Sequence, residues 1–303
     1  MVISVVQLGR IDYATGLRLQ QKLVDLRKED KIGNVLLLLE HTPVITLGRN
    51  ARRENVLASD DFLKQRGVEL YECDRGGDVT FHGPGQLVGY PIFDLRSFTG
   101  PDGQRKTLGA VDYVRRLEEV LIRTCADFGI ASERVKGMTG VWTQLAASNQ
   151  AKIAAIGVHI SRGITSHGFA LNVTNEPLEY FQLIVPCGIP SKPVTSIQQQ
   201  LSLENVILSE DAPKRERPGL GREQGASESK PALSAVEGDP YSQATPSLDE
   251  VAQSAARNFG RVFSGQVLWV DTLDALLEHK VGVPARAPEE LRKIAGEEDK
   301  FWA

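Results

Sequence analysis

Lys152-Ile-Ala-Ala-Ile-Gly157 and His167-Gly-Phe-Ala-Leu-Asn172 lie in two apolar segments that we predict to be strands, over 152–160 and 165–173. Further strands are predicted over 2–7, 35–39, 44–47, 68–73, 141–142 and 267–270, and helices over 14–28, 60–65, 108–128, 177–183 and 248–263. These strands and helices are mixed without strict alternation. The pattern favours an α/β fold of the α+β type, with antiparallel strand pairs, over a doubly wound fold.

The composition is that of a globular protein without an excess of positive charge. The chain has 303 residues, 41% of them hydrophobic, which is enough for one large domain or two small ones. A formal charge of −4 does not favour nucleic acid as a partner. No run approaches the roughly 18 apolar residues of a transmembrane helix, and residues 1–9 lack the basic start of a signal peptide. We therefore expect a cytoplasmic protein with no membrane partner.

Cys187 is a candidate nucleophile because it lies in a Pro/Gly turn, Pro186-Cys187-Gly188. The chain has three cysteines, an odd number, which argues against a disulfide framework and for a reducing compartment. The thiolate is the reactive form of cysteine, and a nearby ammonium group favours it. The alternative is a small buried hydrophobic residue, which is the commoner role of a lone cysteine.

Lys152 is a candidate base because the rest of its predicted strand is apolar or small. Loss of water around such an amine favours the neutral form, which can accept a proton. The alternative is a solvated lysine at a strand edge. His167 and Asn172 could complete a Cys-His-Asn hydrolase set with Cys187. No His, Cys and carboxylate spacing is typical of zinc, so we predict no metal.

Arg75-Gly-Gly-Asp-Val-Thr-Phe-His82 precedes Gly83-Pro-Gly85 and a second strand-like segment. The two segments around this turn predict a β-hairpin. Glycine at 76 and 77 allows close approach of the backbone to a ligand, and Arg75 could hold an anionic or carbonyl group. Neither a phosphate loop nor a dinucleotide motif fits the spacing. The alternative is a plain hairpin with an exposed arginine.

The composition divides the chain into four parts. Residues 1–209 are predicted to form a catalytic domain, and residues 210–247 a disordered insertion rich in Pro, Gly, Ser, Glu and Lys. Residues 248–270 are predicted to return to the catalytic domain as a helix and a strand. Residues 271–303 are predicted to form a charged tail with short helices over 271–280 and 288–295.

Taken together, these segments resemble the octanoyl-[acyl carrier protein]:protein N-octanoyltransferases, also called lipoyl(octanoyl) transferases. The resemblance extends from about residue 2 to residue 202 and returns weakly near 248–263. Several separate motifs carry it in the right order: Arg75-Gly-Gly-x-Val-Thr-x-His82-Gly-Pro-Gly-Gln-Leu-x-x-Tyr-Pro91, Gly140-Val-Trp142, Lys152-Ile-Ala-Ala-Ile-Gly157, His167-Gly-Phe-Ala-Leu-Asn-Val173 and Pro186-Cys-Gly188.

The resemblance implies a biotin/lipoate protein ligase-like fold, in which a mixed sheet has flanking helices. It implies octanoyl transfer from acyl carrier protein to a lysine of a lipoyl domain, in 2-oxoacid dehydrogenase subunits or the glycine-cleavage H protein. Neither ATP nor a metal cofactor is implied, and the protein is expected to be a monomer. Cys187 matches the acyl-accepting cysteine and Lys152 the lysine that tunes it. The acyl pocket is matched by Arg75, Gly76, Gly77, Asp78, Val79, Thr80, Phe81, His82, Ala155, Ile156, Gly157, Gly168, Phe169 and Ala170, with His167 and Asn172 in support.

Three alternatives differ in their chemistry. An ATP-dependent lipoate or biotin ligase of the same fold needs an adenylate site but no catalytic cysteine, so the Pro-Cys-Gly turn argues against it. A non-catalytic module that holds a lipoyl domain or acyl carrier protein would need neither Lys152 nor Cys187. A cysteine thioesterase would release free octanoate instead of transferring it.

Overall fold

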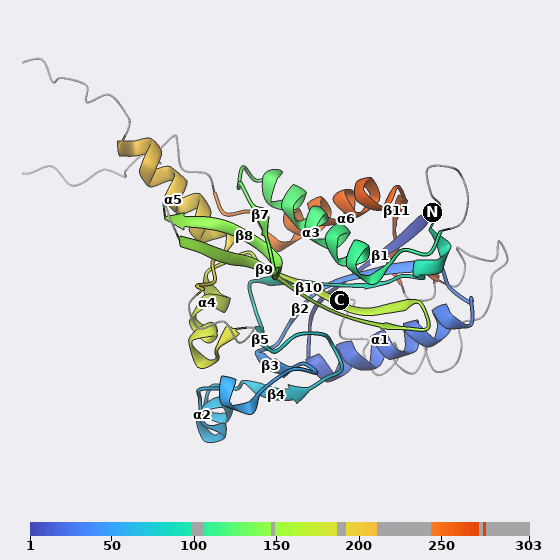
Figure 1. Cartoon of the computed structure of the whole chain (residues 1–303), viewed down its shortest axis with the longest axis horizontal. Helices are drawn as coiled ribbons and strands as arrows, with labels where there is room; N and C mark the ends of the chain where they lie inside the picture. The colour runs from blue at the N-terminus through green and yellow to red at the C-terminus, as the bar shows by residue number, and fades with distance from the viewer. Residues whose placement is uncertain (99–105, 147–148, 187–191, 211–243, 273–274, 277–303) are drawn as a thin grey trace, which may run out of the picture.

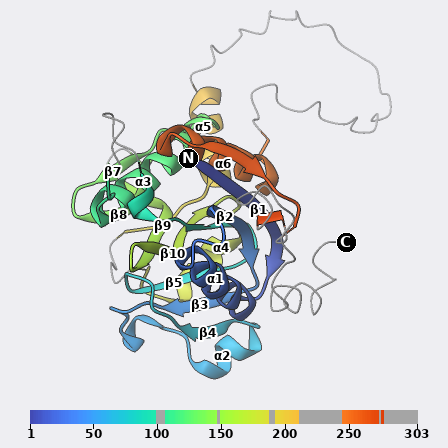
Figure 2. The same ribbon diagram turned by 90° about the vertical axis from the view of Figure 1, so that its right-hand side faces the viewer.

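The computed structural model describes residues 1–98, 106–146, 149–186, 192–210, 244–272 and 275–276. This part of the chain forms a large mixed sheet with helices on both faces and a small second sheet below it (Figures 1 and 2). The predicted class, a mixed β-sheet with flanking helices, is confirmed. Within these residues, no helix combines the length and the apolar character needed to span a bilayer.

The large sheet has eight strands in the order β11-β1-β2-β6-β10-β9-β8-β7. Its strands are β1 (Val2–Ile11), β2 (Asn34–His41), β6 (Gln86–Ile92), β7 (Glu133–Val135), β8 (Met138–Ala146), β9 (Asn149–Ser161), β10 (Ile164–Asn172) and β11 (Gln266–Trp269). β1 is parallel to β2 and β11, and the other pairs are antiparallel. The longest ladder, β9 with β10, contains the two motif strands with which the sequence analysis began.

Helices cover the two faces of the large sheet. α3 (Ala110–Ala126) and α6 (Leu248–Phe263) pack together on one face, and α1 (Tyr13–Lys28) lies on the other (Figure 1). The apolar faces of α3 and α6 share one core cluster with Phe169 of β10. α6 begins with a capping box between Ser247 and Glu250, so the predicted helix over 248–263 starts at its first good cap.

The small sheet has the order β4-β3-β5, from β3 (Val44–Leu47), β4 (Glu69–Glu72) and β5 (Val79–His82), with α2 (Asp60–Gln65) beside it. The predicted hairpin of β5 with β6 is wrong, because the two strands belong to different sheets. β6 pairs with β2 on one edge and β10 on the other, which leaves no edge for β5. The turn at Gly83–Gly85 therefore carries the chain from one sheet to the other, and β5 pairs with β3.

Two short helical turns, α4 (Glu176–Tyr180) and η3 (Phe181–Leu183), occupy the predicted helix over 177–183, and η1 (Arg53–Asn55) and η2 (Leu95–Ser97) lie in loops. The helix α5 (Ile197–Glu210) was not predicted, because its three glutamines after Ile197 leave a weak apolar period. Residues 211–243 and 277–303, with most of the predicted insertion and tail, lie outside the described residues. The division into four parts therefore stays a prediction.

Candidate active site

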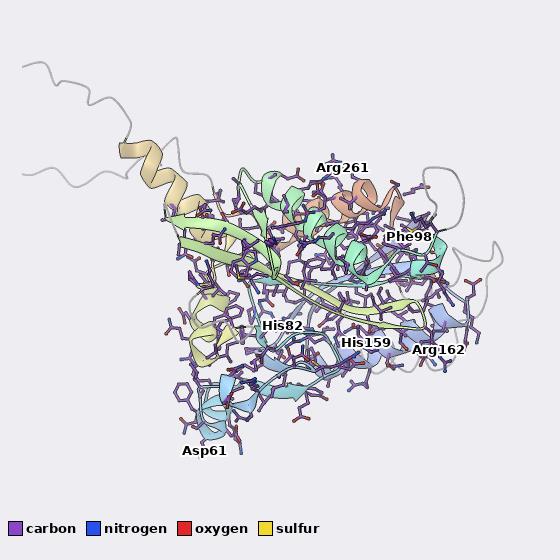
Figure 3. The ribbon with its side chains drawn as sticks, in the orientation of Figure 1. Asp61, His82, Phe98, His159, Arg162 and Arg261 are labelled. Carbon is purple, nitrogen blue, oxygen red and sulfur yellow. The ribbon has the colours of Figure 1, made fainter. Side chains whose placement is uncertain are left out.

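A cavity of about 200 Å³ lies between β9–β10 of the large sheet and the small sheet with its 75–78 loop. Most of the predicted pocket residues line it: Arg75, Gly76, Gly77, Asp78, Thr80, His82, Lys152, Ala155, Ile156, Gly157, His167, Gly168, Phe169 and Ala170. Figure 3 shows His82 and His159 in this region between the two sheets. Residues that are 95 positions apart in the sequence thus meet around one apolar space, as the motif analysis predicted.

Val79 and Phe81 are exceptions among the predicted pocket residues. Side chains alternate along β5, so these two point away from Thr80 and His82. They pack in the core cluster of the small sheet, where Phe81 stacks on Tyr180 with ring centroids 4.5 Å apart. Their role is to hold the strand in place, and contact with a substrate stays a prediction.

Glycine is required on the β10 and β9 sides of the cavity. Ala170 pairs with Ala155 and Gly168 with Gly157 across the ladder. A Cβ on Gly168 would lie 2.1 Å from the carbonyl oxygen of Gly89, and one on Gly157 would lie 2.8 Å from that of Gly76. Any larger residue at either position would therefore push apart the backbones that enclose the cavity.

The Arg75 side chain holds the loop that covers the cavity. Its guanidinium is buried and donates from Nε and Nη2 to Thr46 Oγ1 at 3.1 and 2.9 Å, and from Nη2 to the Thr46 carbonyl at 2.6 Å. Its Nη1 donates to the Gly76 carbonyl at 3.1 Å, and the Gly76 N–H donates to Val158 of β9 at 3.0 Å. These bonds fasten the loop to both sheets, and binding of a ligand by the guanidinium stays a prediction.

His82 is neutral and has a defined tautomer. Gln86 Nε2 donates to the Phe81 carbonyl and to Asn172 Oδ1, at 3.2 and 2.9 Å, so its Oε1 is the acceptor for His82 Nδ1 at 2.8 Å. The hydrogen is therefore on Nδ1, and Nε2 is an acceptor. Burial lowers the pKa of His82 to about 3, with a further contribution from His41.

Lys152 is buried, which rules out the alternative of a solvated lysine at a strand edge. Its side chain is 8% exposed as part of the residue, and Nζ lies 4.8 Å from the centre of the Trp142 ring. Its backbone N–H donates to the Pro193 carbonyl at 2.9 Å, and its carbonyl accepts from Thr195 N–H at 3.0 Å. Lys152 is thus held in the middle of β9 at one end of the cavity.

A smaller adjoining cavity brings the chain on both sides of residues 187–191 to Lys152. Pro186 and Val194 line this cavity together with Lys152, Ala155 and Ala170. Cys187 follows Pro186 directly in the chain but lies outside the described residues, and so does its predicted distance from Lys152. Thr80 Oγ1 is buried beside both cavities and has no hydrogen-bond partner within the described residues.

His167 and Asn172 belong to separate hydrogen-bond networks. His167 Nε2 donates to Asp74 Oδ1 at 2.7 Å, whereas Asn172 donates from Nδ2 to the Thr195 carbonyl at 2.9 Å and accepts from Gln86. Burial lowers the pKa of His167 despite the partly opposing effect of Asp74. The pair predicted for a Cys-His-Asn hydrolase is therefore divided between two ends of β10.

Several lining residues were not predicted: Tyr13, Tyr90, Gly137, Met138 and Thr139. Tyr90 is part of a quoted motif, which is a signal that could have identified it. Tyr13 stacks on His82 with ring centroids 6.3 Å apart, but it is the first residue of α1 and has no motif around it. Only the packing of α1 against the small sheet reveals it.

A group of at least three His, Cys, Asp or Glu side chains arranged to hold a metal ion is not present among the described residues. The cysteines described, Cys73 and Cys125, are free thiols. Burial raises the pKa of Cys125 to about 12, so this thiol in the core of α3 stays protonated at neutral pH.

Residues 12–210 match the model of the lipoyl protein ligase A/B catalytic domain. The chain belongs to this family. It is 52% identical over 293 residues to an octanoyltransferase of Koribacter versatilis, with 97% of each chain covered. It is 54% identical over 278 residues to an octanoyltransferase of Acidobacterium capsulatum, with 91% of this chain and 96% of that one covered.

Solved structures of family members have the same fold. A bi-partite lipoate protein ligase of Thermoplasma acidophilum superposes with a TM-score of 0.57 at 14% identity, over 98% of this chain and 92% of that one. A lipoate-protein ligase A bound with ATP gives 0.57 at 12% identity, over 98% and 94%. These similarities confirm the predicted ligase-like fold.

Proposed function

We propose that this protein is an octanoyltransferase, which moves an octanoyl group from acyl carrier protein to a lysine of a lipoyl domain. The observation that carries the proposal is identity of 52–54% to octanoyltransferases over more than nine-tenths of the chain. The apolar cavity that ends at the buried Lys152 supports it. The lipoate ligases, at 12–14% identity, share the fold, and this likeness carries no assignment of their reaction.

The proposed reaction has two thioester steps. The Cys187 thiolate attacks the carbonyl carbon of the octanoyl thioester, a new C–S bond forms, and the carrier's thiolate leaves. The lysine amine of the acceptor then attacks the Cys187 thioester, an amide C–N bond forms, and the Cys187 thiolate is released. Because the donor is already a thioester, neither step needs ATP, and one difficult transfer becomes two easier ones.

Lys152 would serve both steps. As an ammonium it would favour the Cys187 thiolate, and as a neutral amine it would accept the proton that the acceptor lysine loses. The Thr80 hydroxyl, buried and without a partner in the described structure, is placed to donate to the carbonyl oxygen as it becomes an oxyanion. The proposal requires neither a metal nor a nucleotide cofactor.

The partners follow from the reaction. The acyl donor would be octanoyl-acyl carrier protein, and the acceptors would be lipoyl domains of 2-oxoacid dehydrogenase subunits and the glycine-cleavage H protein. A cytoplasmic location and a monomeric state remain predictions from the sequence.

Intact mass measurement tests the proposal directly. Incubation with octanoyl-acyl carrier protein and no ATP should give an octanoyl adduct on the protein, and addition of an unmodified lipoyl domain should transfer it. The adduct should disappear in Cys187→Ser and persist in Cys73→Ser, a matched control at another described thiol. Absence of an adduct in the natural protein, or a product only with ATP, would overturn the proposal.

A further inference from the structure

We propose that His167, held by Asp74, is the wall that limits the length of the acyl chain in the cavity. This inference rests on the proposed function, because it concerns which acyl chains the same site accepts. It is carried by the direction of the cavity along β9–β10, by a second cavity beyond His167, and by the contacts that keep the imidazole between the two.

The cavity has a reactive end and a far end. Lys152, Pro186 and Thr80 lie at the reactive end, where the thioester would form. From there β9 runs from Lys152 to Gly157, a length of about 16 Å at 3.3 Å per residue. Gly168 lies opposite Gly157, and His167 follows opposite Val158. An acyl chain that extends away from Lys152 along this ladder therefore ends at His167.

A second cavity of about 260 Å³ lies on the other side of His167. Its lining includes Gln20, Asp74, His159 and Ser166, and it is polar where the acyl cavity is apolar. Among the residues described around the two cavities, His167 is the one that lines both. Removal of its side chain would join the two spaces.

Three contacts hold the imidazole in this position. Nε2 donates to Asp74 Oδ1 at 2.7 Å, and the backbone N–H of His167 donates to Gln20 Oε1 at 2.7 Å. Asp74 is fixed in turn, because its Oδ2 lies 3.6 Å from His159 Nε2 and its carbonyl accepts from Arg49 Nε at 2.8 Å. The ring is 3% exposed, so it cannot swing into solvent without loss of these contacts.

The backbone of His167 shows that the position is imposed. Its φ is 53°, in the left-handed region that non-glycine residues rarely adopt. Regular alternation would place His167 on the side of Phe169, which packs with α6, whereas the observed imidazole bonds Asp74 beside the cavity. Local strain of this kind persists where the surrounding structure requires it and is concentrated at functional positions.

A chain longer than eight carbons would have to displace this ring and enter a polar space. Gln20 Nε2 is buried there and has no hydrogen-bond partner within the described residues, so an alkyl chain beside it would prevent it from meeting water. Octanoyl would fill the apolar cavity up to the ring, and decanoyl would not fit without a break in the His167–Asp74 bond.

The test compares acyl chains of eight and ten carbons in the natural protein and in His167→Gly. Glycine is free to keep a φ of 53°, so the backbone need not change. The measurement is the ratio of kcat/KM for decanoyl-acyl carrier protein to that for octanoyl-acyl carrier protein. Burial of two further methylene groups corresponds to a rise of roughly tenfold in this ratio. His167→Asn, which also tolerates this backbone, should give a smaller rise.

Ser166→Ala is the matched control, because Ser166 lines the second cavity but not the acyl cavity. It should leave the ratio unchanged. A purely structural role of His167 would lower both rates and leave their ratio as it is, and that result in both His167 variants would overturn the wall.

Binding of free octanoate and decanoate by calorimetry separates this inference from the proposed function. If the natural protein transfers octanoyl but the ratios do not change, the function stands and the wall is wrong. If it transfers no acyl group, the proposed function fails, and the ratio of the two fatty acid affinities in His167→Gly still decides on the wall.

Discussion

A fall in pH from 7 to 5 should destabilise this protein through two buried histidines, His41 and His82. Burial lowers the pKa of His41 to about 4 and that of His82 to about 3. In an unfolded chain both groups titrate near pH 6.5. The fold therefore favours the neutral rings, and this contribution to stability is complete above about pH 6.5 and is lost as the pH falls toward the folded values.

The contacts of the two rings explain why the charged form is disfavoured. His41 Nδ1 donates to the Ile11 carbonyl at 3.1 Å, so its Nε2 is the acceptor for the Tyr90 hydroxyl at 2.6 Å. A proton on Nε2 would face that hydroxyl. The His41 and His82 rings lie 6.0 Å apart, so charge on one also opposes charge on the other.

The magnitude follows from linkage. At pH 5 each unfolded histidine is about 1.5 pH units below its pKa while the folded ring stays largely neutral. At about 1.4 kcal/mol per unit, each ring costs about 2 kcal/mol and the pair about 4 kcal/mol. His167, whose pKa is also lowered, acts in the same direction. The lowered carboxyl pKa values of Asp12 and Asp94 matter only at more acidic pH. The loss is a large part of the 5–15 kcal/mol that usually stabilises a native protein.

Urea unfolding at pH 7 and pH 5 measures this difference. In His41→Gln the difference should shrink by about 2 kcal/mol, whatever the variant does to stability at pH 7. Tyr90→Phe is the control, because it removes the hydroxyl and keeps both titrating rings. Equal stability of the natural protein at the two pH values would refute the reasoning, and so would an undiminished difference in a His41→Gln, His82→Gln double variant.

Two further substitutions test the fold around the site. Gly168→Ala should destabilise the protein by about 1–3 kcal/mol in urea unfolding, because its Cβ would lie 2.1 Å from the Gly89 carbonyl oxygen and 2.6 Å from Pro91 Cδ; a loss no larger than that of Ser166→Ala would contradict this packing. Ser247→Ala should lower the stability of α6 by about 1 kcal/mol through loss of the capping box, whereas Gln253→Ala on the exposed side of the helix should change little. Equal melting temperatures of Ser247→Ala and the natural protein would show that the cap is not needed.

Local pattern predicted most of the elements. The helix over 248–263 was found with its exact bounds, because its apolar positions follow the helical period and Ser247 and Glu250 mark its start. The motif strands over 152–160 and 165–173 lie within one residue or a few of β9 and β10. Where the period was weak, as in α5, the sequence carried no usable signal.

The pairing of strands was a different matter. A Gly-Pro-Gly turn between two β-like segments usually indicates a hairpin, yet β5 and β6 belong to different sheets. The choice was made by competition for edges, because β2 and β10 take both sides of β6. Such competition involves residues far apart in the chain, and no local pattern contains it.

By itself, the sequence determined the elements, the mixed class of the fold and the motif residues that surround the cavity, since side-chain type and spacing are local properties. Only the tertiary structure decided which faces those residues present. It turned Val79 and Phe81 into the core, brought Tyr13 beside His82, and placed His167 between two cavities. The physical reason is that burial and hydrogen-bond partners depend on what packs against a strand, and β9 and β10 acquire their partners from the 75–78 loop and α1, which lie far away in the chain.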